Sequence, residues 1–417
     1  MKSPFHSVRP RRRPGHSIEA ILSPILAKLS GVSKHQRTFL TELFSLLLGR
    51  QGRATFENLA RYSRFTELTF RRQFSTFFDW MGFNMACTDF TQGDFIGVFD
   101  CTFVPKSGAK TFGLDKFWSS CAGKAQRGLE VSVLACVNTM TKQCLALDAT
   151  QTPPGISLST DPSAPDKVYS RVSFYLDQLA DCLPRLLTIR YWVGDGFYAK
   201  KEIIALIVSH NRHLITRLRN DADLYYLWNK GRQPGQRGPN RLYDGKVVFT
   251  DLSRWQGAGV HPIHAHITLY TQRLHAKRFG CQLGVVLLLD TRTQKYVLLA
   301  STDVNQDAAQ IAYYYHLRFQ IEILFRDAKQ FTGLTQCQAR SEQKLDYHFN
   351  ASLSTVNIAR LLLAQDQSLQ QSMNALARRL MGRRIWQMIY DQLSFESRVE
   401  LNQLDSSKWQ FWQRKVA

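Results

Sequence analysis

Apolar residues recur at three- and four-residue spacing between positions 18 and 80, which is the pattern of helices with one buried face. The clearest such face is formed by Phe39, Leu40, Leu43, Phe44 and Leu47. We therefore expect residues 1–90 to form a helical region, with residues 1–15 disordered.

Two short helices are expected after a break at the glycines of positions 49–52. The first spans residues 55–62, and the second begins near Thr66, which can cap it, and carries Arg71 and Arg72. A short helix, a tight turn and a basic helix are compatible with a helix-turn-helix that binds DNA. They are equally compatible with a small helical bundle, so the pattern leaves both interpretations open.

The pattern changes near residue 94 to short apolar runs that alternate with helical segments. The expected strands and helices follow in the order strand 95–99, strand 130–137, strand 143–150, helix 168–182, strand 191–193, helix 200–209 and strand 213–218. Strands that alternate with helices after an initial meander predict an α/β domain with a mixed sheet.

Residues of about 221–280 interrupt this alternation with glycines, prolines and basic residues, and we interpret them as a β-rich insertion. The α/β pattern resumes with strands at 284–290 and 296–302, followed by a long helix from about Asp307. Helical spacing continues beyond residue 334. The expected division is therefore a helical region at 1–90, an α/β domain at 91–365 and a helical tail at 366–417.

Charge adds information about the partner of this fold. The 417 residues contain 54 Lys and Arg against 33 Asp and Glu, which gives a net charge of +21. Such an excess predicts a polyanionic partner, most simply a nucleic acid. No apolar run approaches the ~18 residues of a membrane span, and no signal peptide follows the basic N-terminus. We therefore expect no membrane partner and a cytoplasmic location.

The eight cysteines are scattered without a C-x-x-C pair, so the sequence does not predict a structural zinc site. His261, His264 and His266 are close in sequence, but no cysteine or carboxylate pattern accompanies them. We interpret them as loop and strand histidines.

One helical stretch gathers four polar residues on one side. On an α-helix, Tyr315, Arg318, Glu322 and Lys329 fall within roughly a 60° arc. A separate apolar face is formed by Leu317, Ile321, Leu324 and Ala328. A carboxylate surrounded by cations suits a site that handles metal ions and phosphates together.

Two further carboxylates occupy comparable positions on strands. Asp100 follows the first apolar strand, and Asp195 follows a short strand between two glycines. Carboxylates from neighbouring strand ends can meet a third from a helix packed across the sheet. Mg²⁺ prefers such an oxygen cage, and Mn²⁺ can substitute for it. Asp100, Asp195 and Glu322 are therefore the candidate catalytic and metal-binding residues.

These motifs together resemble the DDE transposases of the insertion-sequence-4 group. The signature helix of that group has Tyr, Arg, Glu and Lys at the spacing found here, and the two aspartates precede it in the same order. The resemblance covers roughly residues 90–365. It implies an RNase H-like fold with a β-rich insertion between the second Asp and the Glu, where the irregular segment lies.

The resemblance also implies roles for other residues. From their chemistry, Arg318 and Lys329 can hold DNA phosphates, and Tyr315 can donate a hydrogen bond to a phosphate or stack on a base. All three can instead pair within the protein with Glu322 or its neighbours. An insertion tryptophan of some family members stacks on a flipped base, which makes Trp228 and Trp255 candidates, although both also suit a hydrophobic core. Lys106 and Lys110 lie in a basic stretch after the first Asp that either tracks the DNA backbone or forms a solvated loop.

The resulting hypothesis is a bacterial transposase that binds terminal inverted repeats, cuts DNA and joins the freed 3′-OH to the opposite strand or to target DNA. The resemblance implies a homodimer in a synaptic complex with double-stranded DNA. One alternative is a nuclease of the same fold that cuts without joining. Another is a domesticated, non-catalytic DNA-binding protein. That alternative predicts the loss of one acidic residue or of one of its companions, and none of them is missing here.

Overall fold

The computed structural model describes residues 18–119, 121–156, 169–231, 241–365 and 372–393. The expected disorder of residues 1–15 falls outside this part of the chain. The described residues divide into two compact units. The first contains the chain up to Thr88, Asp327–Gln338 and the residues from Ala351 onward, and the second contains Asp89–Arg326 and Ala339–Asn350.

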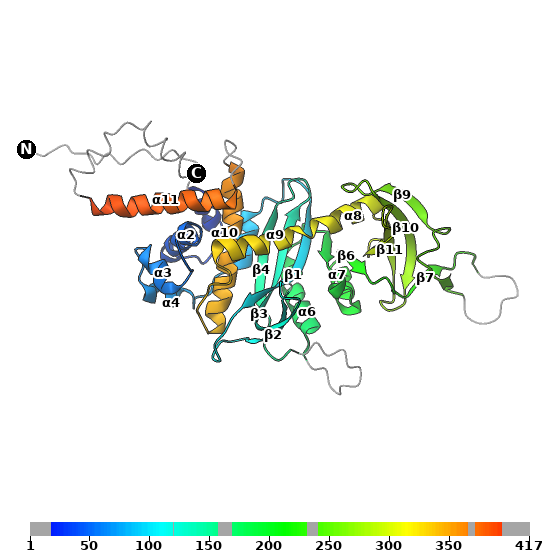
Figure 1. Ribbon diagram of the computed structural model, residues 1–417, viewed down its shortest axis with the longest axis horizontal. Helices are drawn as coiled ribbons and strands as arrows, with labels where there is room; N and C mark the ends of the chain where they lie inside the picture. Colours follow the sequence, from blue (N-terminus) through cyan, green and yellow to red (C-terminus); the bar gives the residue numbers. More distant parts are fainter. Residues whose placement is uncertain (1–17, 120, 157–168, 232–240, 366–371, 394–417) are drawn as a thin grey trace, which may run out of the picture. The chain divides into compact units, whose positions relative to one another are not determined.

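The first unit is helical (Figure 1). Its helices are α1 (Ile18–Ala27), α2 (Lys34–Gly49), α3 (Phe56–Arg61), α4 (Glu67–Gln73), α5 (Trp80–Cys87), η3 (Ala328–Thr332), the later part of α10 (Glu342–Gln365) and α11 (Met373–Gln392). The five residues predicted as the buried face of α2 are all 1% exposed or less. The two short helices begin as expected, because the Thr55 and Thr66 side chains cap α3 and α4.

Helix α11 packs against α2 through one arginine. The Arg384 guanidinium donates to Glu42 Oε1 at 2.9 Å, to Ser45 Oγ at 2.6 Å and to the Tyr62 carbonyl at 2.6 Å. A side chain at Gly49 would approach the α11 backbone within 3.0 Å, so glycine permits this close packing. The predicted helical tail is thereby joined to helices near the start of the chain.

The second unit is built on one mixed sheet of twelve strands, with β2-β3-β1-β5-β6-β12-β11-β10-β7-β8 as its main path (Figure 1). Strand β4 pairs with β3, and β9 pairs with β10. The strands are β1 (Phe95–Pro105), β2 (Asp115–Ser119), β3 (Lys124–Asn138), β4 (Cys144–Gln151), β5 (Tyr191–Gly194), β6 (His213–Leu218), β7 (Leu224–Leu227), β8 (Tyr243–Lys246), β9 (Gln256–Val260), β10 (Ile267–Ala276), β11 (Cys281–Asp290) and β12 (Tyr296–Ser301). Strands β1, β5 and β6 are parallel neighbours, and the other pairs are antiparallel.

Helices lie on both faces of the parallel strands. The unit contains α6 (Arg171–Cys182), the short turns η1 (Leu183–Arg185) and η2 (Gly196–Tyr198), α7 (Lys201–Ser209), α8 (Ala308–Leu317) and most of α9 (Gln320–Asp327). Successive β1 residues point to opposite faces. Cys101 meets Tyr175 of α6 at 3.1 Å, whereas Asp100 meets Arg318 at 3.1 Å. The β1 strand therefore separates α6 from the α8–α9 connection.

The insertion shares its hydrophobic core with the strands that follow it. Buried residues of β7, β10, β11 and β12 form one cluster that also contains Trp255. Strand β12 pairs with β6, so the insertion strands continue the sheet that contains β1, β5 and β6. The described part of residues 221–280 contains strands β7, β8, β9 and β10.

The helix expected from Asp307 onward is interrupted. Helix α8 ends at Leu317, a turn follows at Arg318 and Phe319, and α9 begins at Gln320. Residues Ala328–Thr332 then form a π-helical turn. The prediction of one uninterrupted α-helix is wrong, because the helix breaks at Arg318 and Phe319 and its last turn, before Gly333, has π-helical bonding. The predicted apolar face is nevertheless fully buried at Leu317, Ile321, Leu324 and Ala328.

Candidate active site

The register between β1 and β5 explains why two aspartates meet. Val98 pairs with Val193 in parallel orientation, and continuing this register by two residues puts Asp195 beside Asp100. Residues two apart on a strand share a face, so both carboxylates point to the same side. Asp100 does not end its strand as expected, because β1 continues to Pro105. It lies instead where β5 stops pairing with β1.

Close packing of glycine and aromatic residues fixes this part of the sheet. A Cβ at Gly194 would lie 2.6 Å from the Phe99 ring, and one at Gly97 would lie 2.4 Å from the Trp192 ring. Trp192 is fully buried, and Phe99 is only 2% exposed. Because Gly97 and Gly194 have no side chain, the rings of Trp192 and Phe99 pack directly against them. This packing fixes the backbone just before Asp100 and Asp195.

Each aspartate is held by the backbone that follows it. Asp100 Oδ1 accepts the Cys101 N–H at 2.8 Å, and Asp195 Oδ1 accepts the Phe197 N–H at 2.9 Å. Thr216 of β6 donates its hydroxyl to the Asp195 carbonyl at 2.8 Å. These bonds restrict both side chains to defined rotamers.

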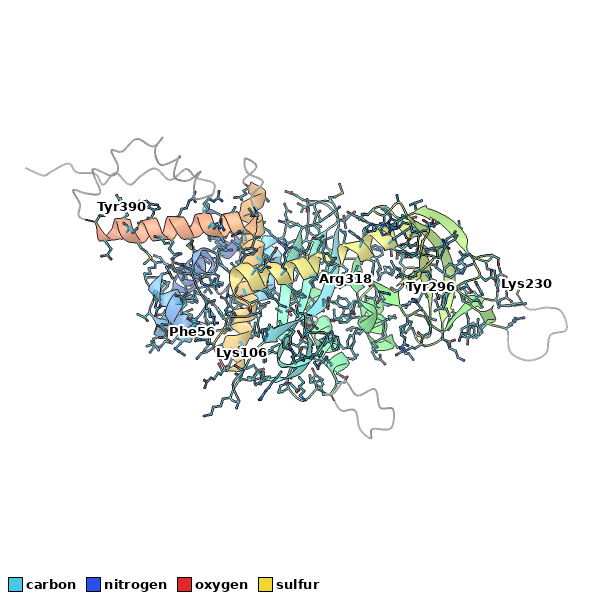
Figure 2. The ribbon with its side chains drawn as sticks, viewed as in Figure 1. Phe56, Lys106, Lys230, Tyr296, Arg318 and Tyr390 are labelled. Carbon is cyan, nitrogen blue, oxygen red and sulfur yellow. The ribbon has the colours of Figure 1, made fainter. Side chains whose placement is uncertain are left out.

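Arg318 connects the first aspartate to Glu322. Its Nη1 donates to Asp100 Oδ2 at 3.1 Å, and its Nη2 donates to Glu322 Oε1 at 2.9 Å. The same guanidinium lies 5.9 Å from the centre of the Tyr315 ring. The interrupted helix thus presents Tyr315, Arg318 and Glu322 to one side. Figure 2 shows Arg318 where the α8–α9 connection crosses the sheet.

The three carboxylates influence one another electrostatically. The pKa of Asp100 is raised to about 6, because burial and the charges of Asp195 and Glu322 raise it more than the nearby Arg318 lowers it. Negative charges close to Asp100 disfavour the ionised form of this carboxylate. The site therefore has a surplus of negative charge that one arginine neutralises only in part.

This donor set has the chemistry of a divalent metal site, but it is not arranged as one. The structure places no three His, Cys, Asp or Glu side chains within the described ranges so that they could share an ion. At Asp100 and Glu322 the positive charge comes from Arg318. Carboxylate oxygens are nevertheless the ligands that Mg²⁺ and Mn²⁺ prefer, so the residues fit these ions in type.

An additional arginine borders the site. Arg217 is exposed near the end of β6, and its charge, like that of Arg318, lowers the pKa of Tyr315, which burial raises above its usual value. The β5–β6 register pairs Gly194 with Thr216, which puts Arg217 next to Asp195. The sequence analysis missed this residue. The feature of the sequence that points to Arg217 is its position as a basic residue near the end of the predicted strand 213–218, which follows the strand before Asp195.

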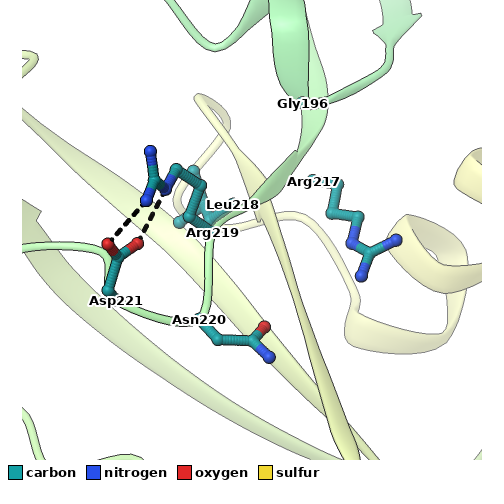
Figure 3. Close-up of a pocket in the computed structure, with 6 residues that line it drawn as sticks. All are labelled: Gly196, Arg217, Leu218, Arg219, Asn220 and Asp221. Carbon is teal, nitrogen blue, oxygen red and sulfur yellow. Dashed lines mark hydrogen bonds and ion pairs between the residues drawn. The ribbon is translucent and has the colours of Figure 1, made fainter. Parts of the chain in front are cut away.

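Arg217 also lines an open pocket of about 500 Å³. The other lining residues are Gly196, Leu218, Arg219, Asn220 and Asp221 (Figure 3). Arg219 and Asp221 form a two-bond ion pair at 2.8 and 2.9 Å. None of the three candidate carboxylates lines this pocket, but Gly196 directly follows Asp195 in the chain.

Other predicted site residues lie elsewhere. Trp255 is 7% exposed within the insertion core, so it cannot stack on a base in this conformation. Trp228 is half-buried, with the Arg241 guanidinium 4.4 Å and the Lys230 ammonium 5.8 Å from its ring centre. Figure 2 shows Lys230 at the far end of the insertion strands from Arg318.

The three predicted lysines are placed by their elements. Lys106 and Lys110 lie in the loop between β1 and β2, where Lys110 is exposed and Lys106 is half-buried. Lys329 lies in η3 of the first unit. In the same unit, Asp327 pairs with Arg360 at 3.1 Å, which agrees with a structural role for this aspartate.

Comparison with known families identifies the class of protein. The family model described as Transposase DDE domain matches residues 92–358, which is more than half of the chain. The chain therefore belongs to the Transposase DDE domain family, whose members are DNA-cutting transposases that generally use divalent metals. A search of curated proteins finds no match. No helix within the described ranges is both long and apolar enough to cross a membrane.

Proposed function

We propose that this protein is a DNA transposase of the insertion-sequence-4 group with an RNase H-like catalytic domain. It binds terminal inverted repeats, cleaves a DNA strand and transfers the freed 3′-OH to the opposite strand or to target DNA. The observation that carries the proposal is that Arg318 joins Asp100 of β1 to Glu322 of α9, while Asp195 follows the parallel neighbour strand β5. A homodimer in a synaptic complex, acting in the bacterial cytoplasm, is part of the proposal.

The carboxylates are the proposed ligands of Mg²⁺ or Mn²⁺. When bound, these ions supply positive charge to the attacking and leaving oxygens of an in-line phosphoryl transfer. The backbone N–H groups of Cys101 and Phe197 hold the two aspartates in place for this role. The mixed charge environment of Asp100 favours binding of a further cation.

The cationic residues are the proposed phosphate ligands. Arg318 and Arg217 flank Tyr315 and present guanidinium groups, which hold phosphate oxygens through two hydrogen bonds at once. The Tyr315 hydroxyl can donate a hydrogen bond to the same group. We propose that Lys329, Lys106 and Lys110 contact the DNA backbone farther along, and that Trp228 contacts a base.

Strand cleavage tests the proposal. The substrate is a labelled duplex that carries the terminal repeat of the encoding element, with Mg²⁺ or Mn²⁺ added. We expect the wild type to cut at the repeat end. Glu322→Gln should reduce the rate on the order of a thousandfold or more, since removal of one member of a catalytic group disables the whole group. Glu202→Gln, an exposed change on α7, is the matched control.

The products separate the remaining alternatives. A hairpin or a joined product supports strand transfer, whereas cleavage alone supports a nuclease of the same fold. Binding of the repeat without cleavage by the wild type would overturn the enzymatic proposal and leave a DNA-binding protein.

A further inference from the structure

A row of three aromatic rings crosses three neighbouring strands of the insertion. Tyr225 of β7 lies 5.2 Å from Tyr243 of β8, and Tyr243 lies 4.9 Å from His275 of β10, measured between ring centres. Strand pairing places His275 opposite Tyr225. The three rings are half-buried, so part of each remains accessible. We refer to Tyr225, Tyr243 and His275 as the aromatic row.

The aromatic row lies on the face of the sheet opposite the insertion core. Leu274 and Ala276 of β10 belong to that core, and His275 lies between them in the sequence. Leu224 and Tyr226 flank Tyr225 in the same way. Because successive strand residues point to opposite faces, the row points away from the core. The row is therefore not required to fill the insertion core.

Cations border the aromatic row along the same strand. Arg273 and Lys277 are exposed and are each two residues from His275, so they share its face. The Lys277 ammonium lies 5.9 Å from the centre of the Tyr225 ring. Lys246, opposite Tyr225 on β8, pairs with Asp223 at 2.9 Å. Three cations against one carboxylate leave this face positively charged.

We propose that the aromatic row binds unpaired DNA bases. Accessible rings at roughly 5 Å spacing on a sheet, bordered by cations, match the requirements of a single strand, whose bases stack while its phosphates are neutralised. Duplex DNA keeps its bases stacked on one another and offers the rings only its backbone. The charge of the face and the series of rings therefore favour a single-stranded occupant over a duplex.

The residues that line the pocket described above connect, in sequence, the candidate active site to these strands. The pocket extends from Gly196, next to Asp195, to Asp221, which lies shortly before β7 begins at Leu224. This position is suited to an unpaired strand that leaves the carboxylates after cleavage. That biological role rests on the proposed function, whereas the binding site itself does not.

Binding of a fluorescein-labelled oligothymidine to the full chain tests the proposal, with a blunt duplex of equal length for comparison. Tyr225→Leu and Tyr243→Leu keep apolar volume but remove the rings, and each should weaken oligothymidine binding about tenfold. Tyr225→Phe should bind as the wild type does. Duplex affinity should change less than twofold in all three variants.

Charge is tested separately. Lys277→Gln should weaken binding of both probes, whereas Lys295→Gln, an exposed change on the β11–β12 turn, should leave both unchanged. Unchanged oligothymidine binding by both Leu variants would overturn the proposal. An equal loss of oligothymidine and duplex binding in the Leu variants would overturn it as well, because it would show a backbone contact without stacking.

The outcome is independent of catalysis. If the Leu variants lose oligothymidine binding while Glu322→Gln cleaves as well as the wild type does, the binding site stands and the proposed active site falls. If Glu322→Gln is inactive while the Leu variants bind normally, the proposed active site stands and the proposed binding site falls.

Discussion

Arg318 connects two of the three candidate carboxylates. It is the shared partner of Asp100 and Glu322, and its side chain is 18% exposed. A guanidinium that bridges two carboxylates is held in a fixed direction by its planar geometry. Lysine, a single point charge, would not reproduce this contact with both partners.

Arg217 should contribute to the rate of cleavage. Replacement by glutamine removes a cation beside Tyr315 and should slow repeat-end cleavage about tenfold, since a hydrogen bond to a charged group is worth about 1.5–3 kcal/mol. Stability should change little because the side chain is exposed. Single-turnover cleavage measures the effect, with Lys201→Gln on α7 as the control. Equal rates for the wild type and Arg217→Gln would remove this residue from the site.

Gly194 should be intolerant of a side chain. A Cβ there would lie 2.6 Å from the Phe99 ring and 3.1 Å from Tyr198 Cβ, in the packed layer next to both aspartates. Gly194→Ala should lower the free energy of unfolding by about 1–3 kcal/mol, the usual cost of overpacking. Urea denaturation measures it. Gly257→Ala, where a Cβ meets nothing within 4 Å, is the control and should change stability far less.

At the scale of elements, the sequence pattern predicted those features that depend only on residues close together in the chain. The caps at Thr55 and Thr66 and the buried face of α2 follow from spacing that any helix of this sequence would share. The interruption at Arg318 could not be predicted in this way, because its partners Asp100 and Glu322 come together only in the folded sheet. The extension of β1 beyond Asp100 likewise depends on its pairing with β3.

The candidate site shows the same limit. The three carboxylates were identified from their positions after strands and on a helix, but Arg217 and the burial of Trp255 depend on tertiary packing. Trp255 lies in a segment without a strong period, so its sequence fits a core residue and an exposed residue equally well. The sequence could not show either the β5–β6 register or the shared core of the insertion.

A histidine cluster should make the connection between the insertion and α8 sensitive to acid. The His261 ring lies 4.9 Å from His264 and 6.2 Å from His316 of α8, and its Nδ1 accepts the N–H groups of Ile263 and His264 at 3.1 and 3.3 Å. Burial, followed by the charges of His264 and His316, lowers the pKa of His261 from 6.5 to about 4. Protonation of His261 Nδ1 would turn this acceptor into an N–H donor that faces the N–H groups of Ile263 and His264.

The sign of the effect follows from this lowered pKa. Between pH 6.5 and about 4 the unfolded chain binds the His261 proton and the folded chain does not. The contribution to stability is therefore complete above pH 6.5 and is lost as the pH falls toward 4, by at most about 3 kcal/mol. Lys142 near His316 adds repulsion, and Asp290, 4.0 Å from His266, opposes it.

Thermal unfolding at pH 8 and pH 5 measures this effect. His261→Asn supplies an amide oxygen that can accept the same N–H groups and cannot be protonated in this range. The variant should lose less stability on acidification than the wild type does. His210→Asn, on the C-terminal end of α7, serves as control, and equal acid sensitivity in all three proteins would contradict the assignment.

At the scale of the whole molecule, the net charge of +21 should dominate DNA affinity. Cationic side chains release counterions from DNA, so binding to the terminal repeat should weaken steeply with salt, by about a thousandfold between 50 and 200 mM if about six phosphates are contacted. Fluorescence anisotropy over this range measures the slope. A slope near zero would show that the charge serves another partner.

The continuity of the sheet has a consequence for how this protein can change during evolution. Strand β12 pairs with the outer edge of β6, and β6 carries Arg217 and borders β5, which Asp195 follows. A deletion from β7 through β12 would leave the backbone amides and carbonyls of β6 open to solvent, and such open edges recruit strands from other chains. Strands β7 to β12 therefore also protect the remaining sheet from self-association, so a shortened descendant would need a replacement edge before it could remain a dispersed protein.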